Sequence, residues 1–129
     1  MTVRNDGLLA GRRLLVVEDE WLIAGQLRRT LERAGAVVLG PALSIEQALA
    51  LLADEPPLDG ALLDLNLRGE LATPVARHLA ERDVPFLLVT AYASDSEDEP
   101  LLRAAPRVGK PFAPAALVRA VARLWSAAG

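Results

Sequence analysis

The sequence of 129 residues has no cysteine and contains only one lysine, one histidine and one tyrosine. The absence of cysteine excludes disulfides, thiolate metal sites and cysteine nucleophiles. No apolar run approaches the roughly 18 residues of a membrane span, and the first residues lack the apolar segment of a signal peptide. With a formal net charge of −3, broad attraction to nucleic acid is not expected. We therefore expect a soluble, cytoplasmic protein that binds neither membranes nor nucleic acid.

The chain is rich in apolar residues, with 52% hydrophobic and 24% charged, which favours a packed core over disorder. Its length, and the absence of a repeat or linker, predict a single domain over residues 1–129. The expected core runs from about residue 12 to residue 127, and residues 1–11 are expected to form an N-terminal extension.

Short apolar runs alternate five times with segments of helical period. Such runs predict strands that are buried on both faces, and the intervening helices predict a parallel sheet covered on both sides. The fold class is therefore α/β, a doubly wound five-stranded parallel sheet of flavodoxin-like order 2-1-3-4-5. The expected strands are Leu14–Val17, Ala36–Leu39, Gly60–Leu63, Phe86–Val89 and Pro106–Gly109.

Helix boundaries are indicated by capping residues. Gly35 is expected to end the first helix, Ser44 to begin the second as part of a capping box, and Thr73 to cap the third, with a proline in its first turn. Pro114 begins the last helix. The fourth helix is expected in the acidic segment 94–99, with a capping box in Ser94 and Glu97. Because Pro100 follows at once and few apolar residues anchor the segment, this helix is expected to be short or mobile.

Polar side chains follow four of the five strands. Because right-handed crossovers place the carboxyl ends of parallel strands at one edge of the sheet, these side chains are expected to converge on one pocket. Clustered carboxylates need a cation, and all-oxygen ligands suit Mg²⁺. Asp19 and Asp64 are the candidate direct ligands, Glu18 a ligand through water, and the backbone carbonyl of Asn66 a further one. The residues at the strand ends are Glu18, Asp19, Glu20, Asp64, Thr90 and Lys110.

Asp64 is then a candidate phosphoryl acceptor, since carboxylates form acyl phosphates. Phosphoryl transfer requires positioning and neutralisation of the phosphoryl oxygens. Mg²⁺, the Lys110 ammonium and the Thr90 hydroxyl are the groups expected to contact those oxygens. A compact ammonium also fits a point contact to phosphate better than a guanidinium does.

Each of these residues has an ordinary alternative. Acids after a strand often cap the next helix, a lone aspartate often forms a turn, and Thr90 is also an unremarkable strand residue. His78 has no partner in motif spacing and is expected to lie on the surface. The joint placement of the others on four strand ends favours a functional site.

The chain resembles the response-regulator receiver domains of bacterial two-component signalling from about Arg12 to Leu124. The matching motifs are Leu-Val-Val-Glu-Asp-Glu ending at Glu20, Ala-Leu-Leu-Asp-Leu-Asn-Leu around Asp64, Phe-Leu-Leu-Val-Thr-Ala around Thr90, and Gly-Lys-Pro-Phe around Lys110. The resemblance implies a phosphoacceptor role for Asp64, a Mg²⁺ pocket at Glu18 and Asp19, a switch role for Thr90 and a phosphate contact for Lys110.

One position departs from the family pattern. Most receivers carry a switch aromatic three residues before the lysine, where this chain has Arg107. Tyr92 lies two residues after Thr90 instead, as in the atypical "FATGUY" subgroup of often single-domain regulators. We therefore interpret Tyr92 as a possible switch aromatic. Trp21, at the head of the first helix and nearly opposite its core face, is a candidate contact for an incoming kinase, with packing against the neighbouring loop as the alternative.

Two other functions fit part of the pattern. A haloacid-dehalogenase-type phosphatase needs a second aspartate where this chain has Asn66, and a degenerate receiver would act only as a binding module. The favoured hypothesis is a non-enzymatic receiver, with at most self-catalysed phosphotransfer and dephosphorylation at Asp64. Its expected partners are a histidine kinase or histidine phosphotransfer protein and a downstream protein target, and it is expected to be a monomer or homodimer.

No output domain is expected after the last helix, so output by protein contact is expected. The chain is then a stand-alone regulator, a phosphate shuttle or sink between proteins, or a piece of a hybrid kinase, and Met1 favours the first. The expected contact surfaces are the acidic segment 94–99, the fifth strand and the last helix. On that helix, Val118 and Trp125 are placed beside the core stripe.

Overall fold

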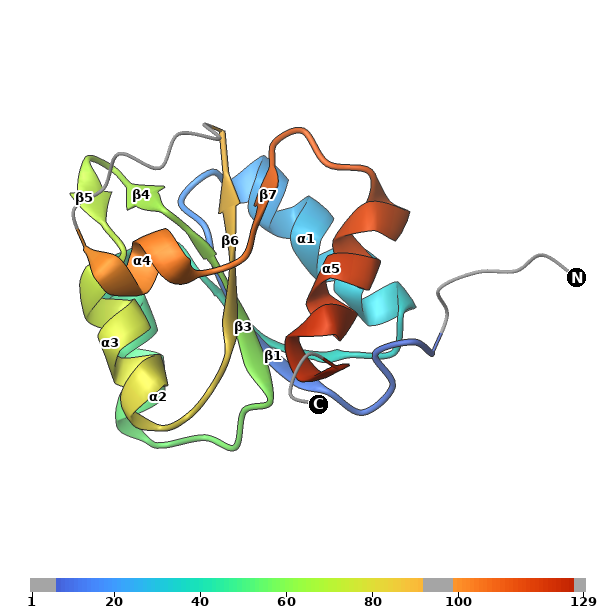
Figure 1. Cartoon of the computed structure of the whole chain (residues 1–129), viewed down its shortest axis with the longest axis horizontal. Coiled ribbons are helices and arrows are strands. Elements are labelled where there is room, and N and C mark those ends of the chain that lie inside the picture. Colours follow the sequence, from blue (N-terminus) through green and yellow to red (C-terminus); the bar gives the residue numbers. More distant parts are fainter. Residues whose placement is uncertain (1–6, 92–98, 127–129) are drawn as a thin grey trace, which may run out of the picture.

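The computed structural model describes residues 7–91 and 99–126, which form a sheet with helices on both faces (Figure 1). No helix in these two ranges is long and apolar enough to cross a bilayer. In chain order the elements are β1 (Arg13–Val17), α1 (Trp21–Arg33), β2 (Val37–Ala42), α2 (Ile45–Ala53), β3 (Gly60–Asp64), β4 (Asn66–Leu67), β5 (Glu70–Leu71), α3 (Thr73–Glu81), β6 (Phe86–Thr90), α4 (Pro100–Ala104), β7 (Arg107–Gly109) and α5 (Pro114–Ser126).

The five main strands are parallel and lie in the order β2-β1-β3-β6-β7. This is the predicted 2-1-3-4-5 order once the small β4–β5 pair is set aside. Side chains alternate between the two faces of each strand, so one core packs against α1 and α5 and the other against α2, α3 and α4 (Figure 1). All residues of β3 and β6 are buried, which places the ends of these two strands at the centre of the carboxyl edge.

Two predicted boundaries are wrong in detail. The second strand does not end before Gly40 but continues to Ala42, because β2 is an edge strand, where a proline without an N–H is tolerated. Its register against β1 shifts at this point. Thr73 does not cap the third helix: Ala72 holds the N-cap position, and Thr73 is the first helical residue. The Ser44 cap is confirmed, since its hydroxyl accepts a hydrogen bond from the Gln47 N–H at 3.0 Å.

Residues near both ends of the described chain pack against the core. Leu9 is fully buried in the core beside α1 and α5. Val118 is also buried rather than lying beside the core stripe. Trp125 is half-buried: its indole N–H donates to the Asp59 carbonyl at 2.8 Å, and the Arg12 guanidinium lies 4.0 Å from its ring centroid. Neither Val118 nor Trp125 therefore offers a free contact surface.

The fourth helix is short, as predicted, but it does not lie in the acidic segment 94–99. It covers five residues, Pro100–Ala104, and Pro100 stands in its first turn, where a proline is tolerated. The capping residues expected for it, Ser94 and Glu97, lie outside the described residues, as does Tyr92. At the C-terminal end of α4, the Arg107 guanidinium donates to the carbonyl oxygens of Leu102 at 2.7 Å and Arg103 at 3.4 Å. The arginine in place of a switch aromatic thus adds a donor to the Leu102 carbonyl, which also accepts from the Ala105 N–H at 3.2 Å, and to the Arg103 carbonyl.

Candidate functional site

Four strand ends bring the predicted polar residues into one pocket. Glu18 and Asp19 directly follow β1, Asp64 ends β3, Thr90 ends β6 and Lys110 directly follows β7. Glu18, Asp64 and Thr90 are the three buried polar or charged residues of the described chain, with 0%, 7% and 3% of their surface exposed. Polar side chains are rarely buried without a chemical reason, so this edge of the sheet is the strongest candidate for a functional site.

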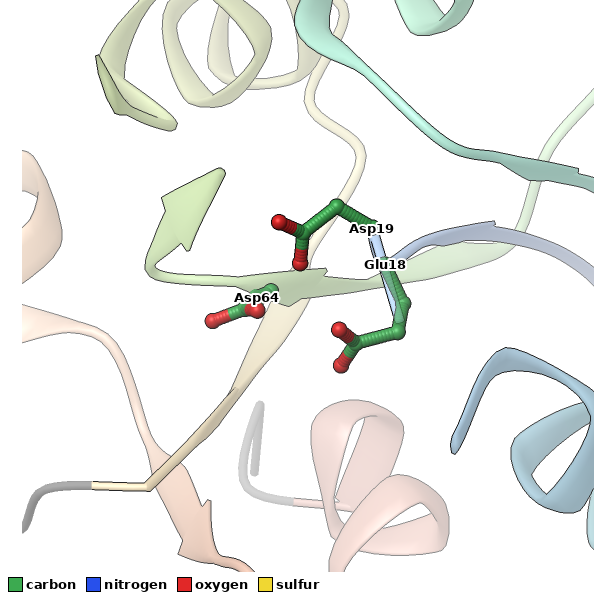
Figure 2. Close-up of side chains that lie close together, drawn as sticks. All are labelled: Glu18, Asp19 and Asp64. Carbon is green, nitrogen blue, oxygen red and sulfur yellow. The ribbon is translucent and has the colours of Figure 1, made fainter. Parts of the chain in front are cut away.

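The three carboxylates converge (Figure 2). Glu18, Asp19 and Asp64 each contribute an oxygen, and these atoms all lie within 4.8 Å of one another. Two backbone N–H groups hold two of these carboxylates in place: that of Glu20 donates to Glu18 Oε2 at 3.0 Å, and that of Asn66 donates to Asp64 Oδ1 at 3.2 Å. Three anionic oxygens at this spacing fit a hard divalent cation such as Mg²⁺, which prefers oxygen ligands.

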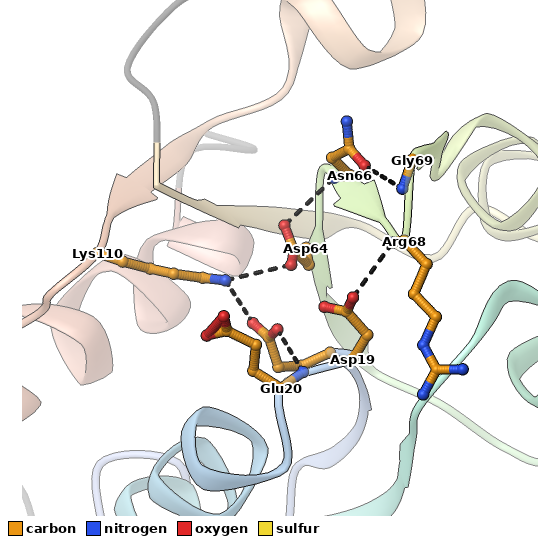
Figure 3. Close-up of polar contacts among 8 residues, drawn as sticks. Asp19, Glu20, Asp64, Asn66, Arg68, Gly69 and Lys110 are labelled. Carbon is orange, nitrogen blue, oxygen red and sulfur yellow. Dashed lines mark hydrogen bonds and ion pairs between the residues drawn. The ribbon is translucent and has the colours of Figure 1, made fainter.

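Asp19 is held by a contact that the sequence did not predict. The Arg68 N–H donates to Asp19 Oδ2 at 3.2 Å, and the Gly69 N–H donates to Asn66 Oδ1 at 2.8 Å (Figure 3). Both donors belong to the turn of the β4–β5 hairpin. Arg68 and Gly69 have positive φ angles of 54° and 90°, the geometry of tight hairpin turns. Glycine favours a positive φ and arginine does not, so Gly69 was the sequence signal for this turn.

Lys110 reaches across the pocket from the opposite side (Figure 3). Its Nζ lies 2.7 Å from Glu18 Oε1 and 3.2 Å from Asp64 Oδ2, and its side chain is 11% exposed. Its backbone N–H donates to the Thr90 carbonyl at 2.8 Å, which fixes the lysine to the end of β6. The only lysine of the chain is therefore positioned beside the candidate phosphoacceptor.

Burial governs the protonation of this cluster. Loss of hydration raises the pKa of Glu18 to about 7, with the Asp64 charge adding to the rise and the Lys110 and Glu20 contacts opposing it. For Lys110, burial alone would lower the pKa, but the hydrogen bond to Glu18 and the charges of Asp64 and Glu18 outweigh it and raise the pKa. The pocket without metal therefore favours a charged lysine and a partly protonated Glu18 near neutral pH.

This protonation predicts a pH-dependent stability for the metal-free protein. The pKa of Glu18 rises from 4.5 in the unfolded chain to about 7 in the folded one. The contribution of Glu18 to the free energy of unfolding is therefore fully present below pH 4.5 and is lost as the pH rises through 7. At about 1.4 kcal/mol per pKa unit, the loss is on the order of 3 kcal/mol. Urea unfolding in EDTA at pH 5 and pH 8 measures it.

Glu18→Gln should remove most of this pH dependence, because the glutamine does not titrate. Glu46→Gln, at an exposed position of α2, is the matched control and should leave the dependence unchanged. Mg²⁺ added at pH 8 should restore stability to the original chain but much less to Glu18→Gln. An equally steep pH dependence in Glu18→Gln would contradict the assignment.

The remaining predicted residues do not all reach the pocket. The exposed Asn66 side chain is engaged in the hairpin turn, whereas the role predicted for Asn66 concerns its backbone carbonyl and stays a prediction. Trp21 is 72% exposed, so the alternative of packing against the neighbouring loop is wrong. His78 is half-buried rather than on the surface, and its Nδ1 is buried without a hydrogen-bond partner among the described residues.

The chain matches the response regulator receiver domain family over residues 14–122. The chain belongs to this family. No curated protein matches it. The receiver fold accounts for the parallel sheet and for the pocket at its carboxyl edge, and the phosphatase alternative gains no support. Membership of the "FATGUY" subgroup stays a prediction.

Solved structures of several receivers are similar to this receiver. A response regulator receiver protein from Sinorhizobium medicae has a TM-score of 0.78 and 25% identity, with 94% of this chain and 99% of that chain covered. SdrG from Sphingomonas melonis has a TM-score of 0.75 and 39% identity, with 88% and 96% covered. The response regulator TrrA from Thermotoga maritima, in complex with Mg²⁺-BeF, has a TM-score of 0.74 and 29% identity, with 88% and 98% covered.

Proposed function

We propose that this receiver accepts a phosphoryl group on Asp64 from a histidine kinase or a histidine phosphotransfer protein and signals by protein contact. The observation that carries the proposal is the placement of the Lys110 Nζ 3.2 Å from Asp64 Oδ2, beside three carboxylates whose oxygens lie within 4.8 Å of one another. An acceptor carboxylate, a fixed ammonium and an oxygen-lined cation site are the groups that phosphoryl transfer to a carboxylate requires.

In the proposed reaction, an Asp64 carboxylate oxygen forms a bond to phosphorus while the bond from phosphorus to the donor's histidine nitrogen breaks. The electron pair of the broken bond stays on that nitrogen, and the product is an acyl phosphate. Lys110 contacts one phosphoryl oxygen as an ammonium, from a position in which its Nζ lies 3.2 Å from Asp64 Oδ2. Thr90 supplies a hydroxyl from the end of β6.

The donor set fits Mg²⁺, with Asp19 and Asp64 as direct ligands, Glu18 through water and the Asn66 carbonyl as a further ligand. Bound there, the ion would neutralise the charge that otherwise keeps a phosphoryl group away from a carboxylate. The Mg²⁺-BeF complex of the similar Thermotoga maritima regulator supports this assignment. In this chain, Glu18 and Asp19 after β1 and Asp64 at the end of β3 provide an oxygen-rich pocket.

Readout is proposed to involve Thr90 and Tyr92 rather than the usual strand aromatic. Arg107 occupies that position and donates to carbonyl groups of α4. Tyr92→Ala is therefore expected to alter partner affinity, while Asp64 stays competent for phosphorylation.

The proposal is tested by incubating the protein with Mg²⁺ and a small-molecule phosphodonor, followed by intact mass measurement and mapping of the modified residue. An acyl phosphate on Asp64 that disappears when EDTA replaces Mg²⁺ supports the proposal. Absence of the adduct in Mg²⁺, or an adduct on another residue, would overturn it. Beryllofluoride binding followed by NMR gives an independent readout of the same pocket.

Trp21 tests the docking of a protein donor. It begins α1 two residues after Asp19 and is largely exposed, as an aromatic residue that contacts a partner would be. We expect Trp21→Ala to slow phosphotransfer from a phosphorylated histidine phosphotransfer protein by about tenfold. Phosphorylation by the small-molecule donor should be unchanged, because the residue lies outside the reacting groups.

Val37→Ala is the matched control, since Val37 is also an exposed apolar residue but lies on edge strand β2. It should leave both rates unchanged. Equal slowing of the two donors by Trp21→Ala would show a structural effect instead of a docking contact.

A further inference from the structure

The three carboxylates of the site are not all held in the same way. Glu18 and Asp64 both contact the Lys110 ammonium, and each also accepts a hydrogen bond from a backbone N–H. Asp19 is half-buried, and within the described residues its side chain has a single hydrogen-bond partner, the Arg68 N–H at 3.2 Å. The direction in which Asp19 presents its oxygens to a cation therefore depends on the position of one backbone group.

That backbone group belongs to the tip of the β4–β5 hairpin (Figure 3). Leu67 pairs with Glu70, so Arg68 and Gly69 form a two-residue turn, and their φ angles are 54° and 90°. A hairpin turn of type I′ requires a positive φ at both central residues. Glycine adopts this conformation freely, whereas a residue with a Cβ adopts it at a cost. Gly69 therefore permits the turn that directs the Arg68 N–H toward Asp19.

The hairpin is fixed both at its base and across its turn. At the base, the Ala72 N–H donates to the Leu65 carbonyl at 2.9 Å. Across the turn, the Gly69 N–H donates to Asn66 Oδ1 at 2.8 Å. The backbone N–H of Asn66 donates in turn to Asp64 Oδ1 at 3.2 Å. One short segment therefore connects Asp64 to the turn that holds the neighbouring carboxylate.

We propose that the β4–β5 hairpin is a positioning element for the metal site, and that Gly69 sets the Mg²⁺ affinity through the hydrogen bond from the Arg68 N–H to Asp19. Gly69 has no side chain to offer as a ligand, so it acts only through the backbone. A carboxylate whose rotation is already fixed by an N–H loses less freedom when it binds a cation, so it binds the cation more tightly. The inference rests on the proposed Mg²⁺ site and adds the element that shapes it.

The backbone of Arg68, and not its side chain, is the group that acts in this arrangement. The side chain is exposed, and an arginine is not needed for the turn, since Asn-Gly is a preferred pair in turns of type I′. Arg68→Asn keeps the N–H and relieves part of the backbone cost. It should therefore bind Mg²⁺ at least as tightly as the original chain.

The test compares Gly69→Ala with Gly11→Ala. A Cβ at either glycine meets nothing within 4 Å, and the φ of Gly11 is also positive, at 77°. Both substitutions therefore strain the backbone of an exposed turn in the same way, without a steric clash. Gly11 precedes β1 and lies at the amino edge of the sheet, opposite the site. The two variants should lose similar stability, but only Gly69→Ala changes the turn beside Asp19.

Mg²⁺ binding is measured on the full chain by titration with Mg²⁺ alone, followed through the backbone amide resonances by NMR. We expect the dissociation constant of Gly69→Ala to rise about tenfold, since loss of a group that orients a metal ligand typically costs tenfold or more in affinity. The Arg68 amide resonance should shift on Mg²⁺ binding in the original chain, and this shift should be lost in Gly69→Ala. Gly11→Ala should bind Mg²⁺ like the original chain.

Asn66→Ala is a second disruption of the same turn. It keeps the backbone carbonyl but removes the oxygen that accepts from the Gly69 N–H, so it should also weaken Mg²⁺ binding. Thermal unfolding in EDTA checks that every variant folds. If Gly69→Ala does not fold, Asn66→Ala decides the outcome.

Weaker binding in the two turn variants, with unchanged binding in Gly11→Ala, supports the inference. It is overturned if the turn variants bind as tightly as the original chain, if Gly11→Ala weakens binding equally, or if Arg68→Asn binds more weakly. Absence of Mg²⁺ binding by the original chain would overturn the proposed metal site together with the inference. Equal affinities in a chain that binds Mg²⁺ and is phosphorylated on Asp64 would overturn the inference alone.

Discussion

Asp64→Asn is expected to abolish acyl phosphate formation completely, from both small-molecule and protein donors. The carboxylate is placed at the end of the fully buried strand β3 with an ammonium at 3.2 Å. An amide in its place has no anionic oxygen to attack phosphorus. Intact mass measurement after incubation with Mg²⁺ and a phosphodonor gives the readout.

The variant should nevertheless fold, because asparagine has the same shape as aspartate. It also retains an oxygen for the Asn66 N–H, which donates to Asp64 Oδ1 in the original chain. Asp54→Asn, at the exposed C-cap of α2, is the matched control and should be phosphorylated like the original chain. An adduct of full yield in Asp64→Asn would show that another residue is the phosphoacceptor and would contradict the proposed function.

Most of the fold could be predicted because strong local signals agree with the global arrangement. The four-residue apolar runs became β1, β3 and β6 within a residue of the prediction. Parallel strands with right-handed crossovers allow few arrangements. The predicted strands were therefore enough to place Asp64 and Lys110 at the same edge of the sheet. The convergence of the site residues followed from topology rather than from any single motif.

The features that the sequence did not predict correctly have local physical causes. The apolar residues of α1 recur at three- and four-residue steps, a period that places Leu22 with Leu27 and Leu31 on the buried face. Leu22 is nevertheless 64% exposed, because Ala24, Leu27 and Leu31 form the buried stripe. Periodicity gives a face about 100° wide and does not resolve which of two adjacent apolar residues lies at its margin. The β4–β5 pair is two residues long on each side, shorter than any period can reveal.

The contacts within the pocket were beyond sequence reasoning for a different reason. That Lys110 lies nearer to Glu18 than to Asp64 depends on side-chain conformations in a buried space. The same holds for Arg107, whose contact with α4 carbonyl groups depends on where the short helix α4 ends. Residue type and spacing indicate which groups meet, whereas the distances depend on packing.

Replacement of Lys110 by methionine should have a large effect on both stability and phosphotransfer. The substitution keeps the apolar stem but leaves Glu18 and Asp64 without their cation in a pocket where Glu18 has no exposed surface. Removing one partner of a buried ion pair typically costs about 3–5 kcal/mol. Phosphorylation of Asp64 should slow by about 100-fold or more, as when one fixed donor to a developing charge is lost.

The pH dependence separates the ion pair from general packing. Below pH 7 protonation of Glu18 relieves part of the unpaired charge, so Lys110→Met should lose less stability at pH 5 than at pH 8. The double variant Glu18→Gln/Lys110→Met should be more stable at pH 8 than Lys110→Met alone, which a double-mutant cycle measures as coupling. Arg119→Met, at an exposed position of α5, is the control for loss of a cation.

Lys110→Arg distinguishes charge from shape. A guanidinium keeps the positive charge beside Glu18 and Asp64, so Lys110→Arg should keep most of the stability that Lys110→Met loses. Its planar fork cannot reproduce the point contact of an ammonium with one phosphoryl oxygen, so phosphotransfer should remain slow. Full recovery of the rate in Lys110→Arg would show that the lysine acts only as a charge. Stability equal to that of the original chain in Lys110→Met at pH 8 would show that the ion pairs at 2.7 Å and 3.2 Å contribute no net stabilisation.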